Sequence, residues 1–86
     1  MKKIEIIPLA QRKADKRGIK TEWIEDAFSH PEQVVDGYGG RKVIHKRLFI
    51  EEKEYLLRVV YEETDESYVT ITAYLTSQIK RYWKED

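Results

Sequence analysis

The sequence predicts a single small α+β domain, with helices near its start and an antiparallel sheet in its back half. Two observations support this class. Apolar residues recur at helical spacing between residues 9 and 28, and from Gln33 onward they alternate with polar residues as in strands. A chain of 86 residues can bury one hydrophobic core but not two. We therefore expect one domain covering residues 1–86.

The first elements are a short strand and a helix. Lys2–Ile7 alternates and is rich in isoleucine, which favours a strand, and Pro8 suits the first turn of a helix. Leu9–Arg17 then has alanines four residues apart, and Gly18 is placed to cap the helix at its C-terminal end.

A second helix is predicted to begin at Thr21, which is a plausible N-cap. Its apolar stripe consists of Trp23, Ile24, Ala27 and Phe28. His30-Pro31 ends it, because the residue before a proline avoids helical geometry. We expect the two helices to form a hairpin that packs against the sheet.

The remaining elements are strands joined by turns. A glycine-rich turn at residues 37–40 follows a short segment at Val34-Val35, and longer strands are predicted at about 41–50, 54–62 and 67–76. These would form an antiparallel meander of three to four strands. Thr76 or Ser77 is expected to cap a short helical tail.

Composition limits the function classes. The 16 basic and 16 acidic residues balance, so any nucleic-acid binding must depend on local charge, such as the four cations within residues 41–47. The absence of cysteine excludes disulfides and thiolate catalysis, and two separated histidines make a structural metal site unexpected. No apolar run approaches the roughly 20 residues of a membrane span, and no signal-peptide core follows the start. We expect a cytoplasmic protein without a cofactor.

Alternation in the strands predicts which side chains share a face. In the last strand, Val69, Ile71, Ala73 and Leu75 are expected to face the helices. The opposite face of the sheet would then collect the following side chains: Arg41, His45, Arg47, Arg58, Tyr74 and several threonines. Lys46 would fall on the helix side, near its edge.

This inventory suits phosphodiester chemistry. A guanidinium can hold a phosphate and stabilise its developing charge, while imidazole or phenol groups move protons and aromatic rings stack on bases. Simpler interpretations remain open. Solvated sheet faces commonly carry Thr, Tyr and Arg, and Arg58 could pair with an acid such as Glu5. His45 could fill space between strands, and Trp83 could fasten the C-terminus.

Several short motifs carry a family resemblance over almost the whole chain. They are Arg17-Gly18-Ile19, Trp23-Ile24, Pro31–Val35, Gly40-Arg41-Lys42, Tyr55–Val59 and the tail from Tyr74 through Thr76-Ser77 to Tyr82-Trp83. In these the sequence resembles a family of small bacterial and archaeal domains of unknown function within the RelE/ParE-like toxin superfamily. It is also similar to BrnT-type toxins in the order of its elements.

The resemblance implies a RelE-like fold and a toxin of a toxin-antitoxin system. Such a toxin is a metal-independent endoribonuclease that cleaves mRNA, often at the ribosome, and is neutralised by a small antitoxin protein. By position, the implied catalytic residues are Arg58, Tyr82, His45 and Arg47. The implied RNA-binding residues are Arg41, Lys46, Tyr74, Lys80 and Arg81.

The chain departs from the pattern at two places. Leu9-Ala10 stands where many relatives have His-Ala, and Tyr74 stands where toxins often have a basic residue. ParE-type relatives act on gyrase and are not nucleases, so the fold does not determine the activity. The alternatives are a non-catalytic RNA- or protein-binding module on the same fold and a ParE-like inhibitor of a protein target.

Overall fold

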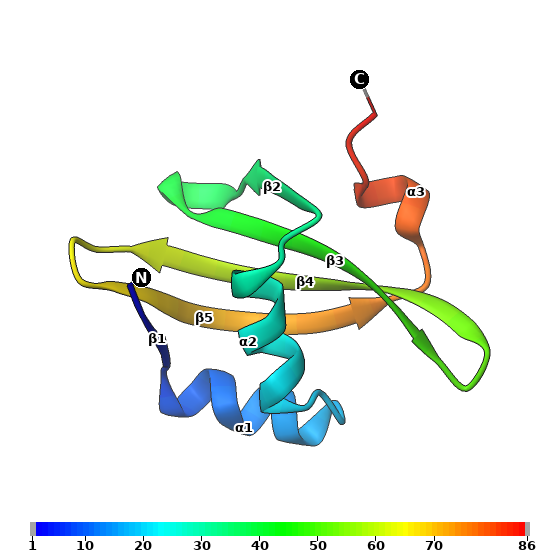
Figure 1. Cartoon of the computed structure of the whole chain (residues 1–86), viewed down its shortest axis with the longest axis horizontal. Coiled ribbons are helices and arrows are strands. Elements are labelled where there is room, and N and C mark those ends of the chain that lie inside the picture. Colours follow the sequence, from blue (N-terminus) through cyan, green and yellow to red (C-terminus); the bar gives the residue numbers. More distant parts are fainter. Residues whose placement is uncertain (1, 86) are drawn as a thin grey trace.

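The structure, a computed structural model, describes residues 2–85 and confirms the α+β class. Its elements are β1 (Lys3–Ile6), α1 (Pro8–Lys16), α2 (Thr21–Ser29), β2 (Gln33–Asp36), the 3₁₀ turn η1 (Tyr38–Gly40), β3 (Lys42–Ile50), β4 (Lys53–Glu63), β5 (Ser67–Thr76) and α3 (Ile79–Tyr82). The five strands form one mixed sheet in the order β1-β5-β4-β3-β2 (Figure 1). β1 runs parallel to β5, and the other neighbours are antiparallel.

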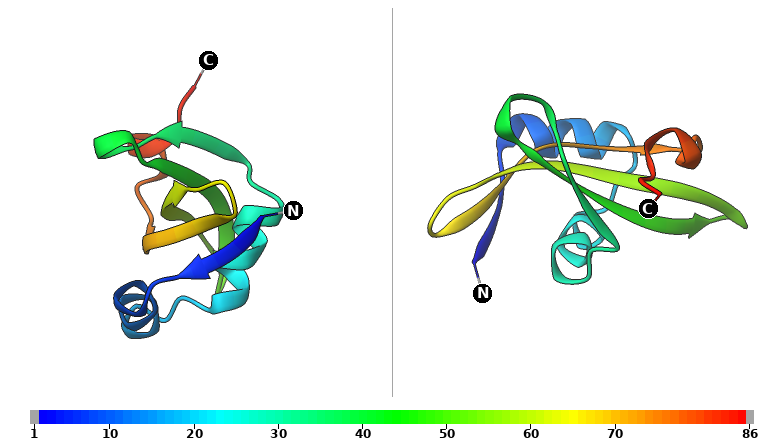
Figure 2. Two further views of the ribbon diagram at one scale, coloured as in Figure 1. Left: turned by 90° about the vertical axis from the view of Figure 1, so that its left-hand side faces the viewer. Right: turned by 90° about the horizontal axis from the view of Figure 1, so that it is seen from above.

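Helix α2 covers one face of this sheet (Figures 1 and 2). Its Ile24 and Ala27 are fully buried, and Phe28 packs edge-on against Tyr61 with ring centroids 5.1 Å apart. The sheet residues of this core are Ile44, Leu57, Val59, Tyr61 and Ala73. Burial of these apolar side chains provides the main stabilisation of the domain. We call the side covered by α2 the helix face and the other side the open face.

Helix α1 lies along the edge of β5 that β1 leaves free (Figure 2). Its C-terminal end is well defined. Gly18, at φ 69°, closes α1, while Ile19 N–H donates to the Ala14 carbonyl at 2.9 Å and Gly18 N–H donates to the Asp15 carbonyl at 3.2 Å. This pair of hydrogen bonds is a Schellman motif, which confirms the predicted glycine cap. Arg17 then donates from Nη1 to the Ala73 carbonyl at 2.8 Å and so fastens α1 to the strand.

The predicted cap of α2 is wrong. Thr21 is the first helical residue, and Lys20 occupies the N-cap position in an extended conformation without a side-chain cap hydrogen bond. The Thr21 hydroxyl instead accepts a hydrogen bond from Gln11 Nε2 at 3.4 Å. A contact between the two helices has therefore replaced local capping.

A β-bulge corrects the predicted faces of β5. The β4–β5 register shifts between Val60 and Tyr61, which pair with Thr72 and Thr70 respectively, so Ile71 is the extra residue. Ala73 and Leu75 pack in the helix-face core as expected. Before the bulge the alternation is inverted: Tyr68 packs in that core and Thr70 is fully buried, whereas Val69 is opposite Glu62.

The open face receives the C-terminal segment, which turns back over the sheet after β5 (Figures 1 and 2). α3 follows a turn in which Gln78 N–H donates to Thr76 Oγ1 at 3.0 Å. Its N-cap is Gln78, without a side-chain cap bond, so neither Thr76 nor Ser77 caps this helix as predicted.

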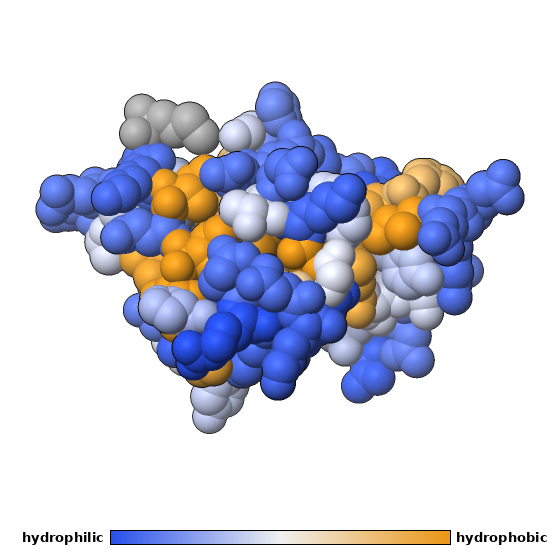
Figure 3. Space-filling view, turned by 90° about the horizontal axis from the view of Figure 1, so that it is seen from below, coloured by the Kyte–Doolittle hydropathy of each residue, from blue (hydrophilic) through white to orange (hydrophobic). Residues whose placement is uncertain are grey.

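Viewed from below, the surface is mostly hydrophilic with apolar side chains visible between the polar ones (Figure 3). Within residues 2–85, no helix has the length and apolar character needed to cross a membrane.

Candidate functional site

A row of four polar residues crosses the open face, one from each of four neighbouring strands. Gln33 of β2 pairs with His45 of β3, His45 with Arg58 of β4, and Arg58 with Tyr74 of β5. We call these four residues the polar row. Their side chains are joined by hydrogen bonds: Gln33 Oε1 to His45 Nδ1 at 2.9 Å, Arg58 Nε to His45 Nε2 at 3.0 Å, and Arg58 Nη1 to the Tyr74 hydroxyl. Strand register alone therefore brings together residues 41 positions apart in the sequence.

The bonding pattern defines the protonation state of His45. Gln33 Oε1 can only accept, so His45 Nδ1 carries the proton, and Nε2 accepts the Arg58 N–H with its lone pair. The ring is completely buried. Burial and the nearby charge of Arg58 lower the pKa of His45 from 6.5 to about 4, so the ring is neutral at pH 7.

His45 consequently has no free nitrogen with which to take a proton from a substrate. Its bond to Arg58 Nε fixes the plane and direction of the guanidinium instead. The geometry therefore makes His45 a positioning residue for Arg58, whereas the resemblance implied a catalytic role.

Arg58 is the centre of the site. It is half-buried, and within residues 2–85 no carboxylate forms an ion pair with it, so the alternative pairing with Glu5 does not occur. Its neighbours are neutral: the imidazole of His45, the phenol of Tyr74 and the ring of Tyr82, whose centroid lies 4.2 Å from Arg58 Cζ. A partly desolvated cation with only neutral partners is well suited to an anionic ligand.

Arg47 lies on the same face and already has a counterion. Its Nη2 and Nε donate to Glu32 Oε2 at 2.8 and 3.2 Å, and its backbone N–H donates to Glu32 Oε1 at 2.6 Å. These hydrogen bonds lower the pKa of Glu32 below its usual value. Arg47 Cζ also lies 4.7 Å from the Trp83 ring. Arg47 is therefore less available to a phosphate than Arg58.

The tail is tied to the polar row through Gln33. Its Nε2 donates to the Lys84 carbonyl at 2.8 Å, and its Oε1 accepts the Lys84 N–H at 3.0 Å. This pair of bonds brings Tyr82 over Arg58 and Trp83 to within 6.3 Å of the His45 ring, centroid to centroid. Trp83 therefore packs beside Arg47 and His45 and fastens the C-terminus, and Tyr82 lies over Arg58 of the polar row.

The remaining predicted residues are dispersed. Arg41 is paired with Glu62 at 3.0 Å. Lys46 is on the other side of the sheet, where its Nζ donates to the His30 carbonyl at 2.6 Å, so the structure does not bring it into the site. Lys80 and Arg81 are exposed on α3 and, within residues 2–85, have no carboxylate partner.

Gln33 is the site residue that sequence reasoning missed. A lone glutamine in a short strand gives no signal of its own. Only the register of β2 against β3 places it beside His45 and below the tail.

Among residues 2–85, no group of three or more His, Asp or Glu side chains is placed to hold a metal ion. Comparison with known proteins gives no assignment, since no protein-family model, curated protein or solved structure matches the chain significantly.

Proposed function

We propose that the protein is a toxin-like, metal-independent endoribonuclease with a RelE-like fold, which holds a phosphodiester of RNA at Arg58. The observation that carries this proposal is the state of Arg58. Its guanidinium is half-buried, is oriented by His45 and Tyr74, and has no acid partner within residues 2–85. Such a group binds phosphate with geometric specificity.

The expected reaction is transesterification. The 2′-oxygen attacks the adjacent phosphorus, the bond from phosphorus to the 5′-oxygen breaks, and the products are a 2′,3′-cyclic phosphate and a 5′-hydroxyl. Arg58 would stabilise the charge that develops on the phosphoryl oxygens. A phenol, from Tyr82 or Tyr74, would donate a proton to the leaving 5′-oxygen. Because His45 is engaged, the 2′-hydroxyl proton passes to solvent.

Aromatic side chains support RNA as the ligand. Tyr74 and Tyr82 flank Arg58, and Trp83 lies beside Arg47. Rings next to a phosphate-binding cation can stack on unpaired bases. In this proposal the physiological substrate is mRNA, on the ribosome or free, and a small antitoxin protein covers the open face.

Expression of the wild-type protein in a bacterial host tests the proposal, with growth followed and mRNA ends mapped. We expect growth arrest and new ends carrying 5′-hydroxyls, both abolished by Arg58→Ala. Arg12→Ala is the matched control, because Arg12 is an exposed cation on α1, away from the open face. Normal growth with intact mRNA in the wild type, or undiminished cleavage by Arg58→Ala, would refute the nuclease.

The saturated bonding of His45 favours a second candidate, a non-catalytic RNA-binding module that uses the same face. It predicts binding to single-stranded RNA that weakens with salt, with a slope of about −0.7 for each phosphate contact. No new RNA ends would form.

A further inference from the structure

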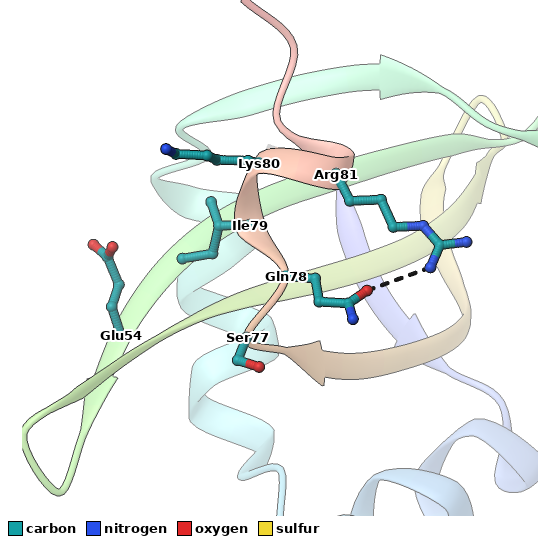
Figure 4. A pocket seen from close by; sticks show the side chains of 6 residues that line it. All are labelled: Glu54, Ser77, Gln78, Ile79, Lys80 and Arg81. Atoms are coloured by element: carbon teal, nitrogen blue, oxygen red, sulfur yellow. Dashed lines mark hydrogen bonds between the residues drawn. The ribbon is translucent and has the colours of Figure 1, made fainter.

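A pocket opens on the open face between the start of β4 and α3. It is lined by Glu54, Ser77, Gln78, Ile79, Lys80 and Arg81 (Figure 4). Glu54 precedes Arg58 by four residues on the same strand, so the two side chains leave the same face of the sheet. At about 3.3 Å per residue, their Cα atoms are roughly 13 Å apart. The pocket is therefore close enough to Arg58 to be reached by the same RNA strand.

Glu54, Ile79 and Lys80 border the opening of this pocket. Ile79 points from α3 toward the space beside Glu54, and Lys80 extends outward above it (Figure 4). Arg81 and Gln78 lie to the other side of α3, joined by a hydrogen bond of 3.3 Å. An apolar wall, a carboxylate and an ammonium thus border one opening.

Glu54 is available to a ligand. Within residues 2–85 it forms no ion pair, and the nearby guanidinium of Arg47 is already bound to Glu32. A free carboxylate repels phosphate, but it accepts hydrogen bonds strongly from N–H groups. This position therefore suits the donor edge of a base, with the phosphate directed toward Lys80.

We propose that this pocket binds a guanine nucleotide of the RNA strand whose phosphate is held at Arg58. The ring packs on Ile79, N1–H and the N2 amino group donate to Glu54, and the nucleotide's own phosphate lies near Lys80. Guanine alone among the four bases presents two adjacent donors to one carboxylate. The inference rests on the proposed function, and it adds a base preference to it.

Methyl NMR of the full chain tests the proposal, with the Ile79 methyl groups observed during titration with GMP, UMP or IMP. We expect GMP to shift the Ile79 signals and to bind about tenfold or more tightly than UMP, as two charge-assisted hydrogen bonds allow. IMP, which lacks the N2 amino group, should be intermediate. Glu54→Gln should remove the preference for GMP. Glu25→Gln should keep it, because Glu25 is an exposed acid on α2.

Three results would each refute guanine binding in the pocket. They are equal shifts of the Ile79 signals by GMP and UMP, no shift by GMP, and an unchanged preference for GMP in Glu54→Gln. Arg58→Ala separates the two proposals, since it should abolish RNA cleavage and retain the GMP shift at Ile79. If wild-type expression in bacteria gives no mRNA cleavage while the GMP preference holds, the nuclease proposal fails and the guanine pocket stands. If mRNA is cleaved but the protein shows no preference for GMP, the guanine pocket fails and the nuclease proposal stands.

Discussion

The buried state of His45 predicts a specific loss of stability in mild acid. Its pKa is about 4 in the folded protein against 6.5 for the free side chain, so the unfolded chain binds a proton more readily. The folded state therefore loses stability as pH falls through 6.5, and the loss is complete below about 4. Between pH 7 and pH 5 the linkage relation gives about 2 kcal/mol.

Urea unfolding followed by tryptophan fluorescence at pH 7, 6 and 5 measures this loss. His45→Gln should remove most of the dependence on pH, whatever its stability at pH 7. His30→Gln is the control, because His30 is exposed, lies outside the polar row and should leave the loss intact. The measurements stop at pH 5 because Glu32 and Asp36, whose pKa values are lowered in the folded protein, add their own losses of stability below that pH. A wild type that loses under about 0.5 kcal/mol, or a His45→Gln variant that loses as much as the wild type, would refute the reasoning.

Three further predictions test other parts of the structure. Arg58→Lys should be as inactive in RNA cleavage as Arg58→Ala, because an ammonium cannot donate to His45 and Tyr74 in the planar geometry of a guanidinium. Cleavage by Arg58→Lys would show that only the positive charge at this position matters. Thr70→Val should raise the free energy of unfolding by about 1 kcal/mol in urea titrations, because the buried Thr70 hydroxyl has no hydrogen-bond partner within residues 2–85. A less stable variant would show that this hydroxyl does form a hydrogen bond. Trp83→Ala should lower the free energy of unfolding by about 1 kcal/mol, because the contact with Arg47 is lost. It should also speed hydrogen exchange at the Lys84 amide, and unchanged exchange would show that Gln33 alone holds the tail.

Local patterns predicted much of the fold. Gly18 at the end of α1, the stripe of α2 and the extent of β5 follow from backbone geometry and side-chain periodicity within one element. The errors arose where distant contacts decide the outcome. The bulge at Ile71 inverted the faces of half a strand, and the contact between Gln11 and Thr21 replaced an expected cap.

The candidate site was predictable to a similar extent. Alternation placed His45, Arg47, Arg58 and Tyr74 on one face, but it carried no information on their partners. Whether Arg47 meets Glu32, or whether Gln33 meets His45, depends on the register of β2, which spans only four residues. The sequence therefore indicated a basic and aromatic face, and the hydrogen bonds then identified Arg58 as its one half-buried cation without an acid partner within residues 2–85.

The polar row also couples stability to the state of the site. His45 can accept from Arg58 Nε only while its Nε2 is unprotonated, and a protonated ring would place a buried cation beside the half-buried guanidinium. Protonation must therefore either release Arg58 from its position or unfold the sheet locally. The Gln33 amide joins the same ring to the Lys84 backbone, so displacement of Arg58 would also loosen the tail that carries Tyr82. RNA binding and tail attachment should consequently weaken together near pH 4, where the folded His45 takes up its proton, and not between pH 6.5 and 5, where the unfolded chain alone is protonated.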